Sequence, residues 1–224
     1  LIVLVLVLVI AVAALAIGGF VAVRSPFPDT DGELELTGLN ETVHVYRDEF
    51  GVPHIYAFNE HDLYFAQGYV HAQDRFWQME FWRHIGQGRI SEIVGEAGLE
   101  QDRFIRTVGW NRMAQAATDY VAQEAPETMA FLEAYSAGVN AYLAEQGDDV
   151  SLNRRILALS GEPWEIEPWE PLDSIGWSIV MSWDLGGNWS DERDRAALIR
   201  EVGEATAASI LPPYPFEERP VIAP

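Results

Sequence analysis

The residues best placed to do chemistry are a polar row on one predicted helix, flanked by two arginines. The row and its flanks are Gln67, His71, Asp74, Gln78, Arg75 and Arg83. Most other positions of this stretch are apolar, so we expect the row to lie close to a core. A buried polar group left without a partner costs about 1–3 kcal/mol. We therefore interpret the row as hydrogen-bonded structural anchors.

Other known catalytic and cofactor motifs do not fit the sequence. The five histidines are scattered without HExxH spacing, and we expect each to be structural: His44, His54, His61, His71 and His84. There is no GxSxG elbow, and a broken GxGxxG at Gly86 follows a helix instead of opening one. The chain contains neither Cys nor Lys, which removes thiol and Schiff-base chemistry. A nucleophile with its base cannot be assembled from this chain alone.

The element that must position the row is a helix beginning near Leu63. Asn59, together with Asp62, is its expected N-cap, and Gly86 and Gly88 are expected to end it. Apolar residues follow two lines at helical spacing, so we expect burial on two faces. The lines are Leu63, Ala66, Val70, Trp77, Phe81 and Ile85, and Phe65, Tyr69, Ala72, Phe76 and Met79.

The rest of the pattern predicts an α+β fold that is largely helical. Alternation predicts a strand over residues 42–48, a turn at 50–53 and a return strand at 54–57. Residues 98–110 are interpreted as a polar connection and 148–168 as mostly loop. Helices are expected over 111–124, from Pro126 to a stop at Gly147, over 171–183, from a cap at Ser190 or Asp191 to Val202, and over 205–211.

Net charge and hydropathy indicate which partners the protein avoids and whether it is attached to a membrane. The net charge of −21 over 224 residues disfavours nucleic acid and anionic membrane surfaces as partners. Residues 1–23, from Leu1 to Val23, are apolar and would span about 35 Å as a helix, which favours a transmembrane anchor over an uncleaved signal segment. Residues 24–41 are expected to be a linker, 42–211 a domain, and 212–224 an extended proline-rich tail.

Four blocks of sequence resemble the small (alpha) subunit of the penicillin acylase family. They are RDEFGVPHIYA, AQDRFWQMEFWRHIGQGRISEIVG, WEPLDSI and LGGNWSDERDRAALI, in that order over roughly residues 43–211. The resemblance implies the largely helical small subunit of an αββα N-terminal-nucleophile hydrolase heterodimer, to which the apolar segment 1–23 would add an N-terminal transmembrane helix. It also implies a zymogen that processes itself, with the catalytic serine as the first residue of a larger beta subunit. On this interpretation the chain holds no catalytic residue, residues 212–224 lie near the processing site, and the hairpin joins the partner's sheet.

The same resemblance implies two contributions from this chain. Glu192 would complete a calcium site shared with the larger subunit, although an acid there could simply favour the helix dipole. Trp183, Leu185, Asn188 and Trp189 would line the acyl side of the substrate pocket, and core packing of the tryptophans is the alternative. The Met and Arg-Phe pair of penicillin G acylases is missing from this region, so no phenylacetyl preference is implied.

The resulting hypothesis is a membrane-anchored, extracytoplasmic amidohydrolase, periplasmic or at the cell surface. It would cut a linear amide between an apolar acyl group and an amine, as in antibiotic metabolism. One alternative is an acyl-homoserine lactone acylase. Another is a catalytically idle acylase-fold subunit of a membrane or cell-surface complex. A transport-type binding protein on an anchor is disfavoured by the four matching blocks.

Overall fold

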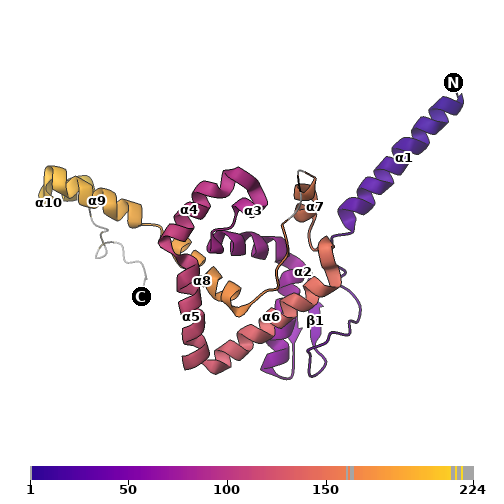
Figure 1. The fold of residues 1–224 in the computed structure, drawn as a ribbon, viewed down its shortest axis with the longest axis horizontal. Helices are drawn as coiled ribbons and strands as arrows, with labels where there is room; N and C mark the ends of the chain where they lie inside the picture. Colours follow the sequence, from indigo (N-terminus) through magenta and orange to yellow (C-terminus); the bar gives the residue numbers. More distant parts are fainter. Residues whose placement is uncertain (1, 160, 162–163, 213–214, 216–217, 219–224) are drawn as a thin grey trace. The chain divides into compact units, whose positions relative to one another are not determined.

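The computed structural model describes residues 2–159, 161, 164–212, 215 and 218. The chain divides into two compact units, Leu1–Val180 and Met181–Pro224. Most described residues are helical, and the described strands form one two-stranded sheet (Figure 1). The prediction of a largely helical fold is therefore confirmed.

The N-terminal helix α1 (Ile2–Arg24) is exposed where its side chains are described. Its stretch Val5–Arg24 has a mean hydropathy of 2.9 and is long and apolar enough to cross a membrane. Figure 1 shows α1 extending beyond the other helices of the first unit. The Arg155 guanidinium donates a 2.6 Å hydrogen bond to the carbonyl of Ala22, in the last turn of α1. This contact satisfies a carbonyl that the end of a helix would otherwise leave open.

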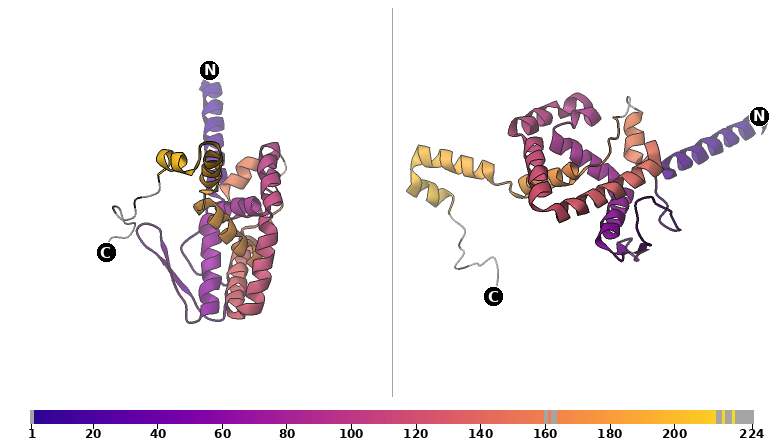
Figure 2. Two further views of the ribbon diagram at one scale, coloured as in Figure 1. Left: turned by 90° about the vertical axis from the view of Figure 1, so that its left-hand side faces the viewer. Right: turned by 60° about the horizontal axis from the view of Figure 1, so that its bottom comes forward.

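The predicted hairpin is present. Strand β1 (His44–Arg47) pairs antiparallel with β2 (Pro53–Tyr56), which begins one residue before the expected start at His54. The carboxylate of Asp48 holds the turn by accepting from the backbone N–H groups of Phe50 and Val52. Figure 2 shows the hairpin beside α2. Arg47 makes this attachment through two hydrogen bonds to the Asp74 carboxylate, at 2.8 and 2.9 Å.

The central helix α2 (Glu60–Gln87) begins three residues before Leu63, where we expected it to start. Asn59 caps it by accepting from the Asp62 N–H at 2.8 Å, as predicted. Gly88 ends it in the left-handed region (φ 68°), which glycine adopts without the cost of a Cβ. Gly86 lies inside the helix, so only the second of the two expected stops is used.

The main core forms where α2 crosses α6 (Pro126–Gln146), which starts at Pro126 and stops at Gly147 as predicted. One apolar line of α2 is buried there through Phe65, Tyr69, Ala72 and Phe76. The other line is buried only in part, because Leu63 is 36% exposed. The expectation of burial on two full faces was therefore too strong, since helices cover α2 unevenly.

The predicted polar connection at 98–110 was wrong. This segment forms α4 (Leu99–Val108), preceded by α3 (Ser91–Val94) and a short 3₁₀ turn η1 (Gly95–Gly98). The charged residues suggested a loop, but most of them lie on the exposed face of α4. Its other face buries Ile105 together with one acid, Asp102. That carboxylate accepts from the backbone N–H groups of Ile90 and Ser91, which satisfies its buried charge.

The remaining helices of the first unit largely follow the prediction. Helix α5 (Trp110–Glu124) starts one residue early, and α8 (Pro171–Leu185) runs two residues further than expected. Residues 148–168 contain a short helix, α7 (Leu152–Ala158), after the 3₁₀ turn η2 (Gly147–Asp149). Ser151 caps α7 by accepting from the Arg154 N–H, a local signal that we missed.

The second unit contains α9 (Trp189–Val202) and α10 (Glu204–Ile210). Asn188 holds the N-cap position of α9, so Ser190 and Asp191 lie in its first turn instead of capping it. The Gly186–Gly187 break before α9 is present as predicted. Pro213, Pro220 and Pro224 of the expected tail lie outside the described residues.

Candidate functional site

The predicted pocket residues lie together in the second unit, on the end of α8 and the start of α9. The rings of Trp183 and Trp189 are 6.1 Å apart, and the Arg193 guanidinium lies 5.1 Å from the centre of the Trp189 ring. Trp183 is 37% exposed, Trp189 47% and Leu185 77%. Packing thus covers more than half of each tryptophan and leaves Leu185 largely exposed. They form an apolar surface that a ligand or another chain can contact.

The two polar residues predicted for this region also meet. Asn188 donates a 3.0 Å hydrogen bond from Nδ2 to Oε1 of Glu192, one turn further along α9. Both side chains are exposed. Among the residues that the structure describes, no group of three or more acidic or histidine side chains could hold a metal ion. Glu192 therefore presents one exposed carboxylate, a hard oxygen donor, in the first turn of α9.

The polar row of α2 does not serve as core anchors throughout, which corrects our interpretation. Asp74 is paired with Arg47, and His71 Nδ1 lies 3.0 Å from the Tyr135 hydroxyl. Gln67, His71 and Gln78, however, line a cavity of about 490 Å³ formed by α2, α5, α6 and α8. Three residues of the row, Gln67, His71 and Gln78, therefore face open space because the covering helices leave a groove along them.

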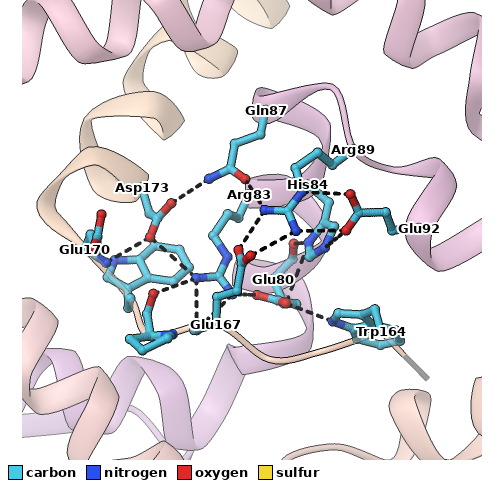
Figure 3. A network of polar contacts seen from close by, with 12 residues as sticks. Glu80, Arg83, His84, Gln87, Arg89, Glu92, Trp164, Glu167, Glu170 and Asp173 are labelled. Carbon is cyan, nitrogen blue, oxygen red and sulfur yellow. Dashed lines mark hydrogen bonds and ion pairs between the residues drawn. The ribbon is translucent and has the colours of Figure 1, made fainter. Parts of the chain in front are cut away.

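A buried charge cluster in the C-terminal half of α2 was missed by the sequence reasoning. Glu80, Arg83 and His84 belong to it (Figure 3). Each of them is at most 5% exposed. Glu80 and Arg83 form an ion pair with 2.5 Å between Oε2 and Nη2. Trp164 donates from its indole nitrogen to Glu80 Oε1 at 2.8 Å, and His84 Nδ1 lies 2.9 Å from the Glu80 carbonyl. The cluster ties α2 to the chain segment before α8.

Arg83 holds that segment through its backbone. It donates to the carbonyl oxygens of Glu167 and Pro168 and lies 3.5 Å from the Asp173 carboxylate. Burial raises the pKa of Asp173, although Arg83 and the Glu170 N–H oppose the change. The entry to α8 is therefore fixed by buried charge and hydrogen bonds together.

A second cation, Arg89, closes the exposed side of the cluster. It makes hydrogen bonds to the carboxylates of both Glu92 and Glu167, and these bonds lower the pKa of each acid (Figure 3). The spacing of Glu80, Arg83 and His84, at i, i+3 and i+4 inside an apolar stretch, was the one sequence signal for the cluster. The hydrogen-bond partners of the cluster, Trp164 and Glu167, lie more than 80 residues away in the chain, which spacing cannot show.

Comparison with known proteins identifies the family to which this chain belongs. The penicillin amidase family model matches residues 42–217. The chain belongs to this family. An acyl-homoserine lactone acylase QuiP of Pseudomonas aeruginosa is 38% identical over 193 residues, covering 86% of this chain and 22% of its own length.

Other relatives agree with this assignment. A penicillin acylase 2 proenzyme of Pseudomonas sp. (strain SE83) is 38% identical over 151 residues, covering 67% of this chain and 19% of its own length. The chain thus spans about a fifth of the curated relatives it matches. Among solved structures, a thermostable penicillin G acylase from Alcaligenes faecalis matches with a TM-score of 0.57 and 22% identity. That match covers 82% of this chain and 93% of the solved chain, and it shows the shared fold.

Proposed function

We propose that this chain is the small subunit of an autoprocessed, extracytoplasmic amidohydrolase. The enzyme would hydrolyse a linear amide between an apolar acyl group and an amine, forming an acyl-enzyme on the N-terminal serine of a larger partner chain. The observation that carries the proposal is the match of the penicillin amidase family model to residues 42–217. The proenzyme named among the relatives supports processing from one precursor.

The chemistry explains why the sequence holds no complete catalytic set. An N-terminal serine can use its own α-amino group as base, because the pKa of that amine lies near 8 and well below that of lysine. The catalytic serine and its base would then arrive together on the partner. This chain would line the substrate pocket and would contribute no reacting atom.

The test is N-terminal sequencing of the larger chain that co-purifies with this one, followed by labelling with a serine-directed covalent inhibitor. We expect an N-terminal serine and a label on that residue alone. Replacing it by alanine in the precursor should leave one uncut chain. A larger chain that begins with a residue unable to attack a carbonyl would contradict the proposal and favour an idle subunit of a surface complex.

A second candidate is acyl-homoserine lactone acylase activity, favoured by the name of the relative that covers 86% of this chain. Both candidates use the same acyl transfer and differ in the amine that leaves. Parallel assays with an N-acyl-homoserine lactone series and with penicillin G separate them through the ratio of kcat/KM values. A ratio above about 100 for one substrate class assigns it, because this equals roughly 2.7 kcal/mol of transition-state discrimination.

The proposed location rests on α1, whose apolar length suits a bilayer core of about 30 Å. The charge of −21 suits a domain held away from anionic headgroups by the linker at residues 24–41. Intact mass of the purified subunit distinguishes a retained anchor from a removed signal. If the anchor is retained, deleting residues 2–24 should move activity from the membrane fraction to the soluble fraction.

Calcium bound through Glu192 is a further part of the proposal. The exposed carboxylate in the first turn of α9 is a suitable hard ligand, and calcium sites need several such oxygens. The partner chain would provide the rest, and the ion would hold the two chains together. Glu192→Ala should remove about one calcium per heterodimer in metal analysis. Glu201→Ala, at the other end of α9, is the matched control, and unchanged calcium in Glu192→Ala would exclude this ligand.

A further inference from the structure

An exposed apolar edge lies at the end of α7. Among the large apolar side chains that the structure describes, that of Leu159 is the most exposed, at 88%. Leu159 directly follows α7 and keeps helical backbone angles. Ile156, three residues earlier, is 56% exposed, and residues three apart lie on the same face of a helix. Leu159 and Ile156, together called the α7 edge, are therefore left open by packing within the first unit.

The α7 edge adjoins the last turn of α1. Arg155, next to Ile156, donates hydrogen bonds of 2.6 Å to the carbonyl of Ala22 and to the hydroxyl of Ser25 (Figure 1). The guanidinium also donates to the Asp149 carboxylate, at 2.8 Å from Nε and 2.7 Å from Nη2. If α1 spans a bilayer, its last turn lies at the level of the headgroups, and Arg155 holds α7 at that same level.

The charges around the α7 edge suit a lipid surface. The whole chain carries −21, yet residues 22–28 and 150–159 contain no acid. Asp149, which precedes the second stretch, is paired with Arg155. No unpaired carboxylate of these stretches would therefore be brought against the headgroups. Phe27, three residues after α1 and 49% exposed, adds a further apolar side chain close to the end of the anchor.

We propose that the α7 edge inserts into the lipid interface beside α1, with Leu159 and Ile156 among the headgroups and Arg155 holding α7 to the end of the anchor. The inference rests on the membrane location in the proposed function and adds a second lipid contact to it. It commits to lipid because the hydrogen bonds of Arg155 make this edge continuous with the membrane-spanning helix. One edge of the domain would touch the bilayer, while most of its acidic surface stays away from the headgroups.

Fluorescence quenching by lipid tests the contact in the assembled, full-length protein. Because this chain contains no cysteine, each introduced cysteine gives it a single site for a dye. Leu159→Cys reports on the α7 edge and Leu8→Cys on the anchor, and Tyr120→Cys, 67% exposed on α5, is the control. The vesicles are phosphatidylcholine with a spin label near the headgroup. We expect quenching at position 159 to exceed that at position 120 by at least about threefold.

The three dye positions separate this inference from the proposed location. Quenching at position 8, with equally weak quenching at 159 and 120, would overturn the inference and leave the anchor standing. Quenching at 159 without quenching at 8 would refute the anchor and leave the lipid contact standing. The larger chain is the competing occupant. A dye at 159 that is shielded from iodide in the complex lacking residues 2–24, without lipid, would show that protein covers the edge and would overturn the inference.

A variant of Arg155 tests how the edge is held. Arg155→Met removes the hydrogen bonds to Ala22 and Ser25 and keeps a long apolar stem. Arg103→Met makes the same change at an exposed position of α4 and is the matched control. We expect Arg155→Met to lower the quenching at position 159 at least about twofold without changing it at position 8, and Arg103→Met to change neither. Unchanged quenching in Arg155→Met would refute the placement of α7 by Arg155.

Discussion

The carbonyl oxygen of Tyr135 lies so close to Gly68 that a Cβ at position 68 would collide with it. The reverse contact is equally close: a Cβ on Gly138 of α6 would collide with the carbonyl oxygen of Phe65 on α2. The two glycines let the backbones of α2 and α6 touch. Since α2 carries the groove row and the charge cluster, this crossing fixes where both of them lie.

Gly68→Ala and Gly138→Ala are each expected to destabilise the protein by about 1–3 kcal/mol or more, because the obstacle is backbone and cannot rotate away. Gly176→Ala is the matched control, since its Cβ would meet Ala114 at an ordinary 3.8 Å and alanine is the better helix former. Thermal unfolding of the purified assembly provides the measurement. Equal melting temperatures for Gly68→Ala and Gly176→Ala would refute the close approach.

Glu80→Ala should destabilise by about 3–5 kcal/mol, because it removes the nearer of the two carboxylates paired with the buried Arg83 and leaves only Asp173, at 3.5 Å. Glu80→Gln should cost less, since its amide oxygen can still accept from the Trp164 indole. Chemical denaturation, read through tryptophan fluorescence, gives both values. A smaller effect for alanine than for glutamine would show that the cluster is not held by Glu80.

Asp62 makes stability depend on acid pH. Burial alone would raise the pKa of its carboxyl, but hydrogen bonds from Asn40, His61, Asn59 and Glu41 hold the pKa well below its usual range. A depressed pKa contributes stability above the unfolded value near 3.9, and this contribution is lost as the pH falls through the folded value.

The corresponding variant is Asp62→Asn, which should cost about 1.5–3 kcal/mol at pH 7 because it replaces charge-assisted hydrogen bonds. Denaturation at a series of pH values should show wild type and variant converging as the pH falls below about 4. A gap that stays constant from pH 7 to pH 3 would contradict the assigned pKa direction.

Trp183→Ala and Trp189→Ala test the acyl pocket. If these exposed rings contact an apolar acyl group, each change should raise KM for a long or aromatic acyl substrate by about 10–200-fold and affect a short acyl substrate less. Val202→Ala, which is also exposed but at the far end of α9, serves as control. Equal losses for long and short acyl groups would point to a structural role.

Local chemistry made several elements of this protein predictable from sequence. Asn59 and Gly88 set the ends of α2 because a cap and a left-handed glycine act over a few residues. Pro126 set the start of α6 in the same way. The four blocks of sequence were sufficient to identify the family. The family resemblance, not spacing, pointed to the site residues, and their roles remain predictions. They are Trp183, Leu185, Asn188, Trp189 and Glu192.

Tertiary contacts decided the rest. The burial of Glu80 depends on a hydrogen bond from Trp164, which lies 84 residues further along the chain. The burial of Asp102 depends on hydrogen bonds from the backbone N–H groups of Ile90 and Ser91. Gln67 and Gln78 look like core anchors until α5, α6 and α8 are placed around them. Sequence periodicity gives the faces of a helix, but which face is covered depends on elements that arrive from elsewhere in the chain.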